Sequence, residues 1–225
     1  MTDCDGIAAE LGRHGLLLRG GFHLESQELA LPGGESVGTV LLAGNAGSGM
    51  WRSFSAQRPE GADPLDRWSG EVLGEVAGLF GGIAVLPSDG PPFWPFQQWA
   101  MRAEPVSPSP IGILIHPVYG LWHGYRGALL FEAVLELPSP TEVETASPCD
   151  ICADRPCLTT CPVSAFSDSG YDVPKCRSHL HSGAGGMCLE GSCLARRACP
   201  VGRDYIYEAA QSAFHMAAFR GGALE

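Results

Sequence analysis

The sequence predicts an α/β or α+β fold with a mixed sheet, followed by a small cysteine-rich module. Two observations lead to this prediction. Short apolar runs alternate with helical patterns through the first 137 residues of the 225-residue chain. Eight of the nine cysteines then lie between Cys149 and Cys199. The chain therefore changes character near its middle.

The expected elements of the first part follow from periodicity. In chain order they are a helix over 7–13, an extended stretch over 16–24, a strand over 37–43, a helix over 64–80, a strand over 82–86, a short helix over 95–104, a buried strand over 111–115 and a long strand or hairpin arm over 122–137. The helix over 64–80 has the strongest signal, because Asp63-Pro64 supplies an N-cap followed by proline in the first turn. Its apolar residues recur at helical spacing: Leu65, Trp68, Val72, Leu73, Val76 and Leu79.

Length and composition predict four parts. A first domain over 1–137 contains a single cysteine, Cys4, which is expected to be a spare thiol. A proline-containing stretch without apolar periodicity predicts a linker over 138–148. The cysteine module over 149–202 follows, and residues 203–225 are expected to form a helix that packs on the first domain.

The cysteines form two runs that both end in Cys-Pro. The first run is Cys149-x2-Cys152-x4-Cys157-x3-Cys161-Pro162, and the second is Cys176-x11-Cys188-x4-Cys193-x5-Cys199-Pro200. In the bacterial ferredoxin pattern, the fourth cysteine of each run ligates the cluster of the other run. The runs therefore predict two [4Fe–4S] clusters. The first is assigned to Cys149, Cys152, Cys157 and Cys199, and the second to Cys176, Cys188, Cys193 and Cys161.

Two other readings of the cysteines stay open. A Cys-x2-Cys pair such as Cys149 and Cys152 also opens structural zinc sites, and the spacing of Cys188 and Cys193 suits zinc loops. A disulfide framework is the other alternative, but it requires an oxidising compartment, which nothing in the sequence indicates. The repeated Cys-Pro ending and the full count of eight favour the clusters.

Charge and hydropathy restrict the partners. The formal net charge is −11, and residues 1–148 carry 7 basic against 17 acidic side chains. Such a surface repels phosphates, so nucleic acid is not an expected partner. The start of the chain lacks the positive region of a signal peptide, and no run of 18 apolar residues occurs. We expect a soluble, cytoplasmic protein without a membrane partner.

One further segment, 111–137, carries polar residues among apolar ones. His116-Pro117 ends the expected strand over 111–115, and the return strand carries His123 and Arg126. Taken alone, a histidine before proline is more often a structural residue than a ligand.

Residues 111–137 resemble the cobalamin-processing family CblC in the order Ile-His-Pro, Gly-x-Trp and Arg-Gly before an apolar strand. The stretches Asp63-Pro-Leu-Asp66 and Gly38-Thr-Val-Leu-Leu42 occur in the order of that family, and weaker similarity resumes at Arg203-Asp204-Tyr205. The order of the eight cysteines resembles epoxyqueuosine reductase, a cobalamin enzyme with two [4Fe–4S] clusters.

These resemblances imply a flavin-reductase-like or CblC-like mixed-sheet domain joined to a dicluster ferredoxin-like module. They imply cobalamin as a bound cofactor, with His116, Arg126 and Arg203 as its candidate contacts, and a low-potential electron donor protein as partner. The implied activity is reductive processing of cobalamin, by removal of the upper axial ligand and reduction of Co(III). The alternative is a plain dicluster electron carrier that does not use cobalamin.

Overall fold

The computed structural model describes residues 4–25, 29, 34, 36–138, 146–167 and 170–221. The chain divides into two compact units, each built from two stretches of sequence. The first unit contains Met1–Pro105 and Gly124–Val143, and the second contains Val106–His123 and Glu144–Glu225. Most of the expected linker over 138–148 lies outside the described residues.

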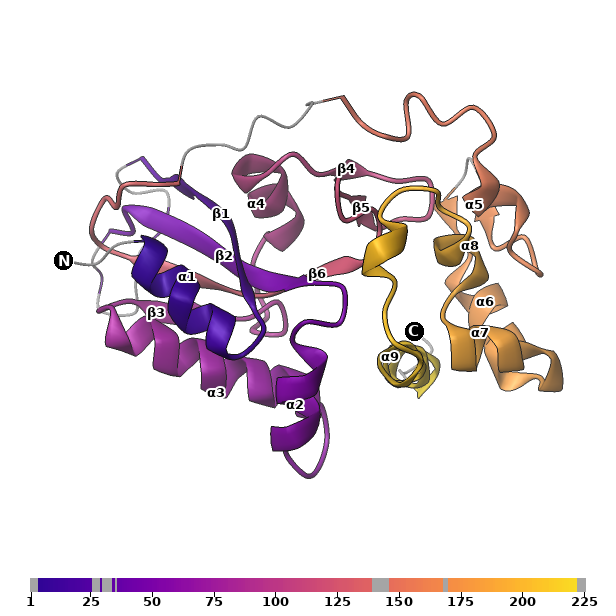
Figure 1. The fold of residues 1–225 in the computed structure, drawn as a ribbon, viewed down its shortest axis with the longest axis horizontal. Helices are drawn as coiled ribbons and strands as arrows, with labels where there is room; N and C mark the ends of the chain where they lie inside the picture. Colours follow the sequence, from indigo (N-terminus) through magenta and orange to yellow (C-terminus); the bar gives the residue numbers. More distant parts are fainter. Residues whose placement is uncertain are drawn as a thin grey trace. The chain divides into compact units, whose positions relative to one another are not determined.

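The first unit is an α+β structure around a four-stranded sheet in the order β1-β2-β6-β3. Its elements are α1 (Cys4–Arg13), β1 (Leu17–His23), β2 (Thr39–Ala46), α2 (Trp51–Gln57), α3 (Pro64–Leu79), β3 (Ile83–Val85), α4 (Phe96–Ala103) and β6 (His123–Phe131) (Figure 1). The strand and helix positions agree closely with those expected from periodicity. The expected arm over 122–137 ends earlier, at Phe131.

The sheet is antiparallel rather than mixed. β1 pairs with β2 in antiparallel register, and β3 pairs with β6 in the same way. β6 inserts between β2 and β3, where Gly38 N donates to Phe131 O at 2.9 Å and the backbone of Gly44 approaches Gly124. A periodic pattern does not reveal such an insertion, because it identifies strands but not their pairing.

Both faces of the sheet are covered. Helices α1 and α3 pack against each other on one side, and α4 packs against β1 and β2 on the other (Figure 1). Seven of the eight residues of β2 are buried as a result. Helix α3 begins at Pro64 as expected, but Asp63 adopts a left-handed conformation (φ 47°) and its side chain makes no capping hydrogen bond. The N-cap position was thus confirmed without its expected bond.

A buried ion pair links β1 to the residue after α4. Arg19 is 2% exposed, and its Nη2 donates to Glu104 Oε1 at 2.6 Å while its Nε donates to Oε2 at 3.2 Å. The Tyr125 hydroxyl also donates to Glu104. Burial raises the pKa of Glu104, although the charge of Arg19 opposes the shift. Removal of either charge would leave the other buried and uncompensated.

Replacing Glu104 with Gln is expected to lower the free energy of unfolding by about 3–5 kcal/mol, with the larger loss at acidic pH. It should also flatten the pH dependence. Because the folded pKa of Glu104 is raised, its favourable contribution is complete below the unfolded pKa and is lost as pH rises through the folded pKa. Urea unfolding at several pH values checks both effects. The control is Glu10→Gln, whose pair with exposed Arg13 should contribute at most about 1 kcal/mol.

The second unit consists of short elements around the cysteines. They are β4 (Ser107–Pro108), β5 (Leu114–Ile115), α5 (Pro156–Thr159), β7 (Phe166–Ser167), β8 (Gly170–Tyr171), α6 (Val173–His181), η1 (Gly183–Gly185), α7 (Gly186–Gly191), α8 (Leu194–Arg197), η2 (Arg203–Tyr205) and α9 (Ala209–Gly221). The expected strand over 111–115 is reduced to β5. Helix α9 packs on α6 and α7 of the second unit, whereas residues 203–225 were expected to pack on the first domain.

The segment between β4 and β6 supplies the core of this second unit. Ile111, Ile115 and Leu121 form one buried cluster with Phe166, Ala195 and Cys199. Four further cysteines, Cys149, Cys157, Cys161 and Cys193, pack against that cluster. The cysteine-rich unit therefore extends beyond 149–202 and depends on apolar residues that precede the expected linker. Among the described residues, no helix has the length and hydropathy needed to cross a membrane.

Candidate functional site

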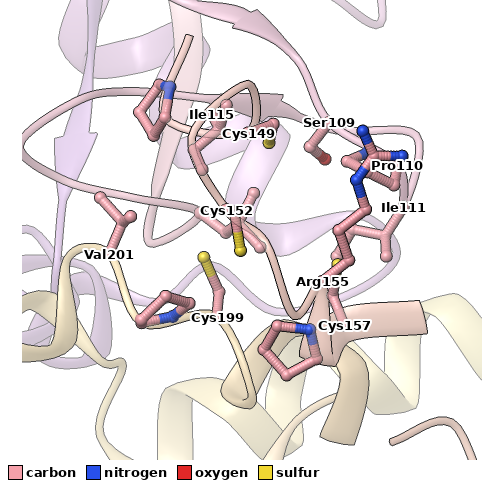
Figure 2. A pocket seen from close by; sticks show the side chains of 14 residues that line it. Ser109, Pro110, Ile111, Ile115, Cys149, Cys152, Arg155, Cys157, Cys199 and Val201 are labelled. Carbon is pink, nitrogen blue, oxygen red and sulfur yellow. The ribbon is translucent and has the colours of Figure 1, made fainter. Parts of the chain in front are cut away.

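Four cysteines line a narrow cavity of about 20 Å³ in the second unit. They are Cys149, Cys152, Cys157 and Cys199. Figure 2 shows the sulfur atoms of Cys152 and Cys199 directed into the same space, although these residues belong to different runs. Apolar side chains, including Ile111, Ile115 and Leu121, complete the walls. This set is the quartet predicted for the first cluster.

The other four cysteines line a second cavity of about 240 Å³. They are Cys161, Cys176, Cys188 and Cys193, and they are the quartet predicted for the second cluster. Aromatic residues form part of this wall, with the rings of Phe166 and Tyr171 stacked 4.5 Å apart. Ile111 lines both cavities, so the two cysteine sets border the same buried side chain.

Two short helices explain why the last cysteine of each run lies in the cavity lined by the other run. Helix α5 leads from Cys157 to Cys161, and α8 leads from Cys193 to Cys199. The helices pack against each other. Each run therefore passes along its helix and places its Cys-Pro step in the cavity lined by the first three cysteines of the other run.

All nine cysteines belong to the described residues, and none of them forms a disulfide bond there. Within the same described part of the chain, no three His, Cys, Asp or Glu side chains converge closely enough to hold a single metal ion.

Burial raises the pKa of five of the eight thiols, those of Cys149, Cys157, Cys176, Cys193 and Cys199. Charge repulsion within each cavity raises these pKa values further. Cys149 is affected by Cys199, and Cys176 by Cys161, which again pairs residues of the two runs. Loading with metal must therefore release protons from these groups.

Hydrogen-bond donors lie around several of the sulfurs. Ala165 N donates to Cys161 Sγ at 3.4 Å, and the backbone N–H groups of Ala195 and Arg196 donate to Cys193. The Tyr171 hydroxyl is hydrogen-bonded to Cys176. Bonds of this kind stabilise thiolate ligands and help to set cluster potentials. The donor set therefore fits two [4Fe–4S] clusters.

His116 lies in the second unit and is 6% exposed. Its Nδ1 accepts hydrogen bonds from the backbone N–H groups of Val118 and Tyr119, at 3.0 and 3.2 Å. The His116 and Tyr119 rings are stacked 4.3 Å apart. These contacts give His116 a structural role in the turn over 116–120.

That turn lies tightly against the chain that follows Cys199. A Cβ atom on Gly120 would stand 2.0 Å from Val201 O, and one on Gly202 would stand 2.2 Å from Tyr119 O. Both glycines also have positive φ values, 58° and 73°. The turn after His116-Pro117 therefore helps to place the closing cysteine of the second run.

Gly120→Ala is expected to push the 116–120 turn away from Val201 and to reduce metal retention by the first cysteine set. The reason is a contact between the new Cβ and a backbone oxygen, which no side-chain movement can relieve. Gly112→Ala is the matched control, because Gly112 has a similar φ of 80° but nothing within 4 Å of its Cβ position. Iron content after anaerobic purification measures the effect. Equal iron in the two variants would contradict it.

The three residues that the resemblance implies for cobalamin belong to both units. Arg126 lies on β6 in the first unit, whereas His116 and Arg203 lie in the second. Arg203 begins η2 and is exposed, and its charge lowers the pKa of Cys199, against a larger effect of burial. In this structure Arg203 therefore acts on a cysteine of the first set.

Sequence reasoning missed two contributors to the site. One is the apolar segment around Ile111 and Leu121, whose hydrophobicity indicated only a strand. The other is Arg196, which lies beside another arginine between the last two cysteines.

Comparisons with known proteins yield no relative. No family model matches the chain, and no curated protein is significantly similar to it.

Proposed function

We propose that this chain is an iron–sulfur redox protein that carries two [4Fe–4S] clusters. The observation that supports this most directly is the division of eight cysteines into two cavities of four. Each cavity contains the closing cysteine of the other run. In dicluster ferredoxins the last cysteine of each run likewise binds the cluster of the other run. Neither zinc sites nor disulfides require this arrangement.

The residues of the chain would hold and tune these groups. Cys149, Cys152, Cys157 and Cys199 would bind the first cluster, and Cys161, Cys176, Cys188 and Cys193 the second. Such clusters accept and release single electrons. The buried apolar wall around Ile111 would exclude water from both sites, and the N–H donors to Cys161 and Cys193 would stabilise their thiolates.

Anaerobic purification followed by metal analysis tests the proposal. We expect about eight irons and about eight acid-labile sulfides per chain, with an electron paramagnetic resonance (EPR) signal after reduction with dithionite. Stoichiometric zinc without sulfide would contradict the proposal. Cys4→Ser should change none of these values, because Cys4 lies in the first unit, where its Sγ donates to Glu136 O at 3.2 Å.

A second proposal concerns the electron acceptor. The resemblance of residues 111–137 to CblC, and of the cysteine order to epoxyqueuosine reductase, supports cobalamin as the molecule that receives the electrons. The reaction would be reduction of Co(III) with loss of the upper axial ligand. A separate low-potential protein would supply the electrons. This second proposal depends on sequence resemblance.

Titration with cyanocobalamin separates the two activities. If cobalamin is the acceptor, dithionite-reduced protein freed of excess reductant should convert cyanocobalamin to Co(II) cobalamin with release of cyanide, while the clusters are reoxidised. The control is protein with Cys176 replaced by alanine, which should supply fewer electrons. An unchanged cobalamin spectrum with the wild-type protein would favour a plain electron carrier.

A further inference from the structure

Arg196 connects the cysteine loops to the segment around Leu121. Its Nε and Nη2 both donate to Leu121 O, at 2.9 and 2.5 Å. Its guanidinium lies 4.5 Å from the centre of the Trp122 ring and 4.6 Å from that of Tyr207. Two aromatic faces and one carbonyl therefore hold a single, partly buried cation.

The backbone of Arg196 contacts both cysteine sets. Its N–H is hydrogen-bonded to the sulfur of Cys193, which lines the second cavity. Its carbonyl accepts a hydrogen bond from Cys199 N at 3.3 Å, and Cys199 lines the first cavity. The position of Arg196 therefore affects one cysteine of each set.

Charge adds a second effect. Arg196 is among the residues that line the second cavity. Reduction of a cluster adds one negative charge, and a nearby cation with limited access to water stabilises that charge more than an exposed cation does. Net charge is one of the quantities that set the potential of a cluster. Arginine suits this position because its planar fork both donates twice and stacks on aromatic rings.

We propose that Arg196 is a positioning residue for the second cysteine set. Its hydrogen bonds to Leu121 O hold the segment over 193–199 in place, and its charge favours reduction of the cluster at that set. This inference rests on the proposed function. It goes further by assigning a redox role to a side chain outside the cysteine runs. The neighbouring Arg197 is exposed and donates to Gly191 O at 2.8 Å, so it offers a matched comparison.

The test is a redox titration of the full chain, followed by EPR. Arg196→Gln removes the charge but keeps a group that can donate to Leu121 O, and Arg196→Lys keeps the charge. We expect Arg196→Gln to move the midpoint potential of one cluster to a more negative value. Arg196→Lys should stay closer to the wild type, and Arg197→Gln should leave both potentials unchanged. The cluster that responds should be the one whose signal is lost in Cys176→Ala.

Three results would overturn the inference. The first is a midpoint potential in Arg196→Gln that equals that of the wild type. The second is a shift of both cluster potentials that is the same in Arg196→Gln as in Arg197→Gln. The third concerns the case in which Arg196→Gln does not retain iron. Arg196→Lys should then still hold about eight irons. Loss of iron from Arg196→Lys as well would show that the charge has no part. Absence of iron and sulfide from the wild-type protein would instead reject the proposed function itself.

Discussion

Cys199→Ala is expected to remove the cluster at Cys149, Cys152 and Cys157 and to leave the cluster of its own run in place. Iron should fall from about eight to about four per chain. The physical reason is that Cys199 lines the first cavity, while Cys161 closes the second. Cys161→Ala should give the opposite result. Iron analysis and the EPR signals of the reduced variants measure both outcomes.

Double variants make this prediction more specific. Adding Cys149→Ala to Cys199→Ala should cause little further loss, because both residues belong to the first cavity. Adding Cys176→Ala should remove nearly all of the remaining iron. If each run instead held its own cluster, adding Cys176→Ala would cause little further loss of iron, and adding Cys149→Ala would remove nearly all of the remaining iron. The two ligation patterns therefore predict opposite results from the same pair of proteins.

Removal of iron by a chelator is expected to open the second unit while the first stays folded. Four of the cysteines that line the two cavities pack against the buried cluster around Ile111. Metal binding should therefore supply much of its folding free energy. Tryptic cleavage after the exposed Lys175 and Arg203 should accelerate many-fold in the metal-free protein. Cleavage after the exposed Arg52 of the first unit provides the internal control.

The metal-free form should also respond to pH in a defined direction. Burial raises the pKa of Cys193 and Cys199 in the folded state. The stability contributed by these neutral thiols is therefore complete below their unfolded pKa and is lost as pH rises through the folded value. Proteolysis of the metal-free second unit should become faster at alkaline pH. Resistance equal to that of the loaded protein would show that the metal contributes little to folding.

Much of the first unit was predictable from local pattern. Helix α3 was identified because Pro64 and the apolar spacing from Leu65 onward act within one element. The antiparallel pairing of β6 was not, because it joins residues far apart in sequence and depends on loop closure rather than on periodicity. The prolines between 138 and 148 indicated a domain boundary. Pro105, Pro108 and Pro110 lie beside the first division of the chain but were not read as a boundary, and the division after His123 has no such compositional sign.

The cysteine sets were predictable because ligand chemistry restricts spacing strongly. The grouping of Cys199 with Cys149 and of Cys161 with Cys176 was predicted by applying the bacterial ferredoxin pattern to the two runs. The contribution of Arg196 could not be predicted, because its neighbour Arg197 has the same chemistry and only the packing of α8 determines which one turns inward. The structural role of His116 likewise depends on a turn that packs against residues 201 and 202 of the same chain, more than eighty residues later.

The second unit is built from two separate stretches of sequence, and this restricts how its gene can be rearranged. A gene rearrangement that cut between 138 and 148 would leave Ile111, Ile115 and Leu121 with the first fragment and every cysteine of the two sets with the other. The first product would expose an apolar segment, and the second would lack the core on which its loops pack. The cysteine-rich part of this protein therefore cannot be transferred between genes as one continuous segment, because residues 106–123 lie between two stretches of the first unit in the sequence.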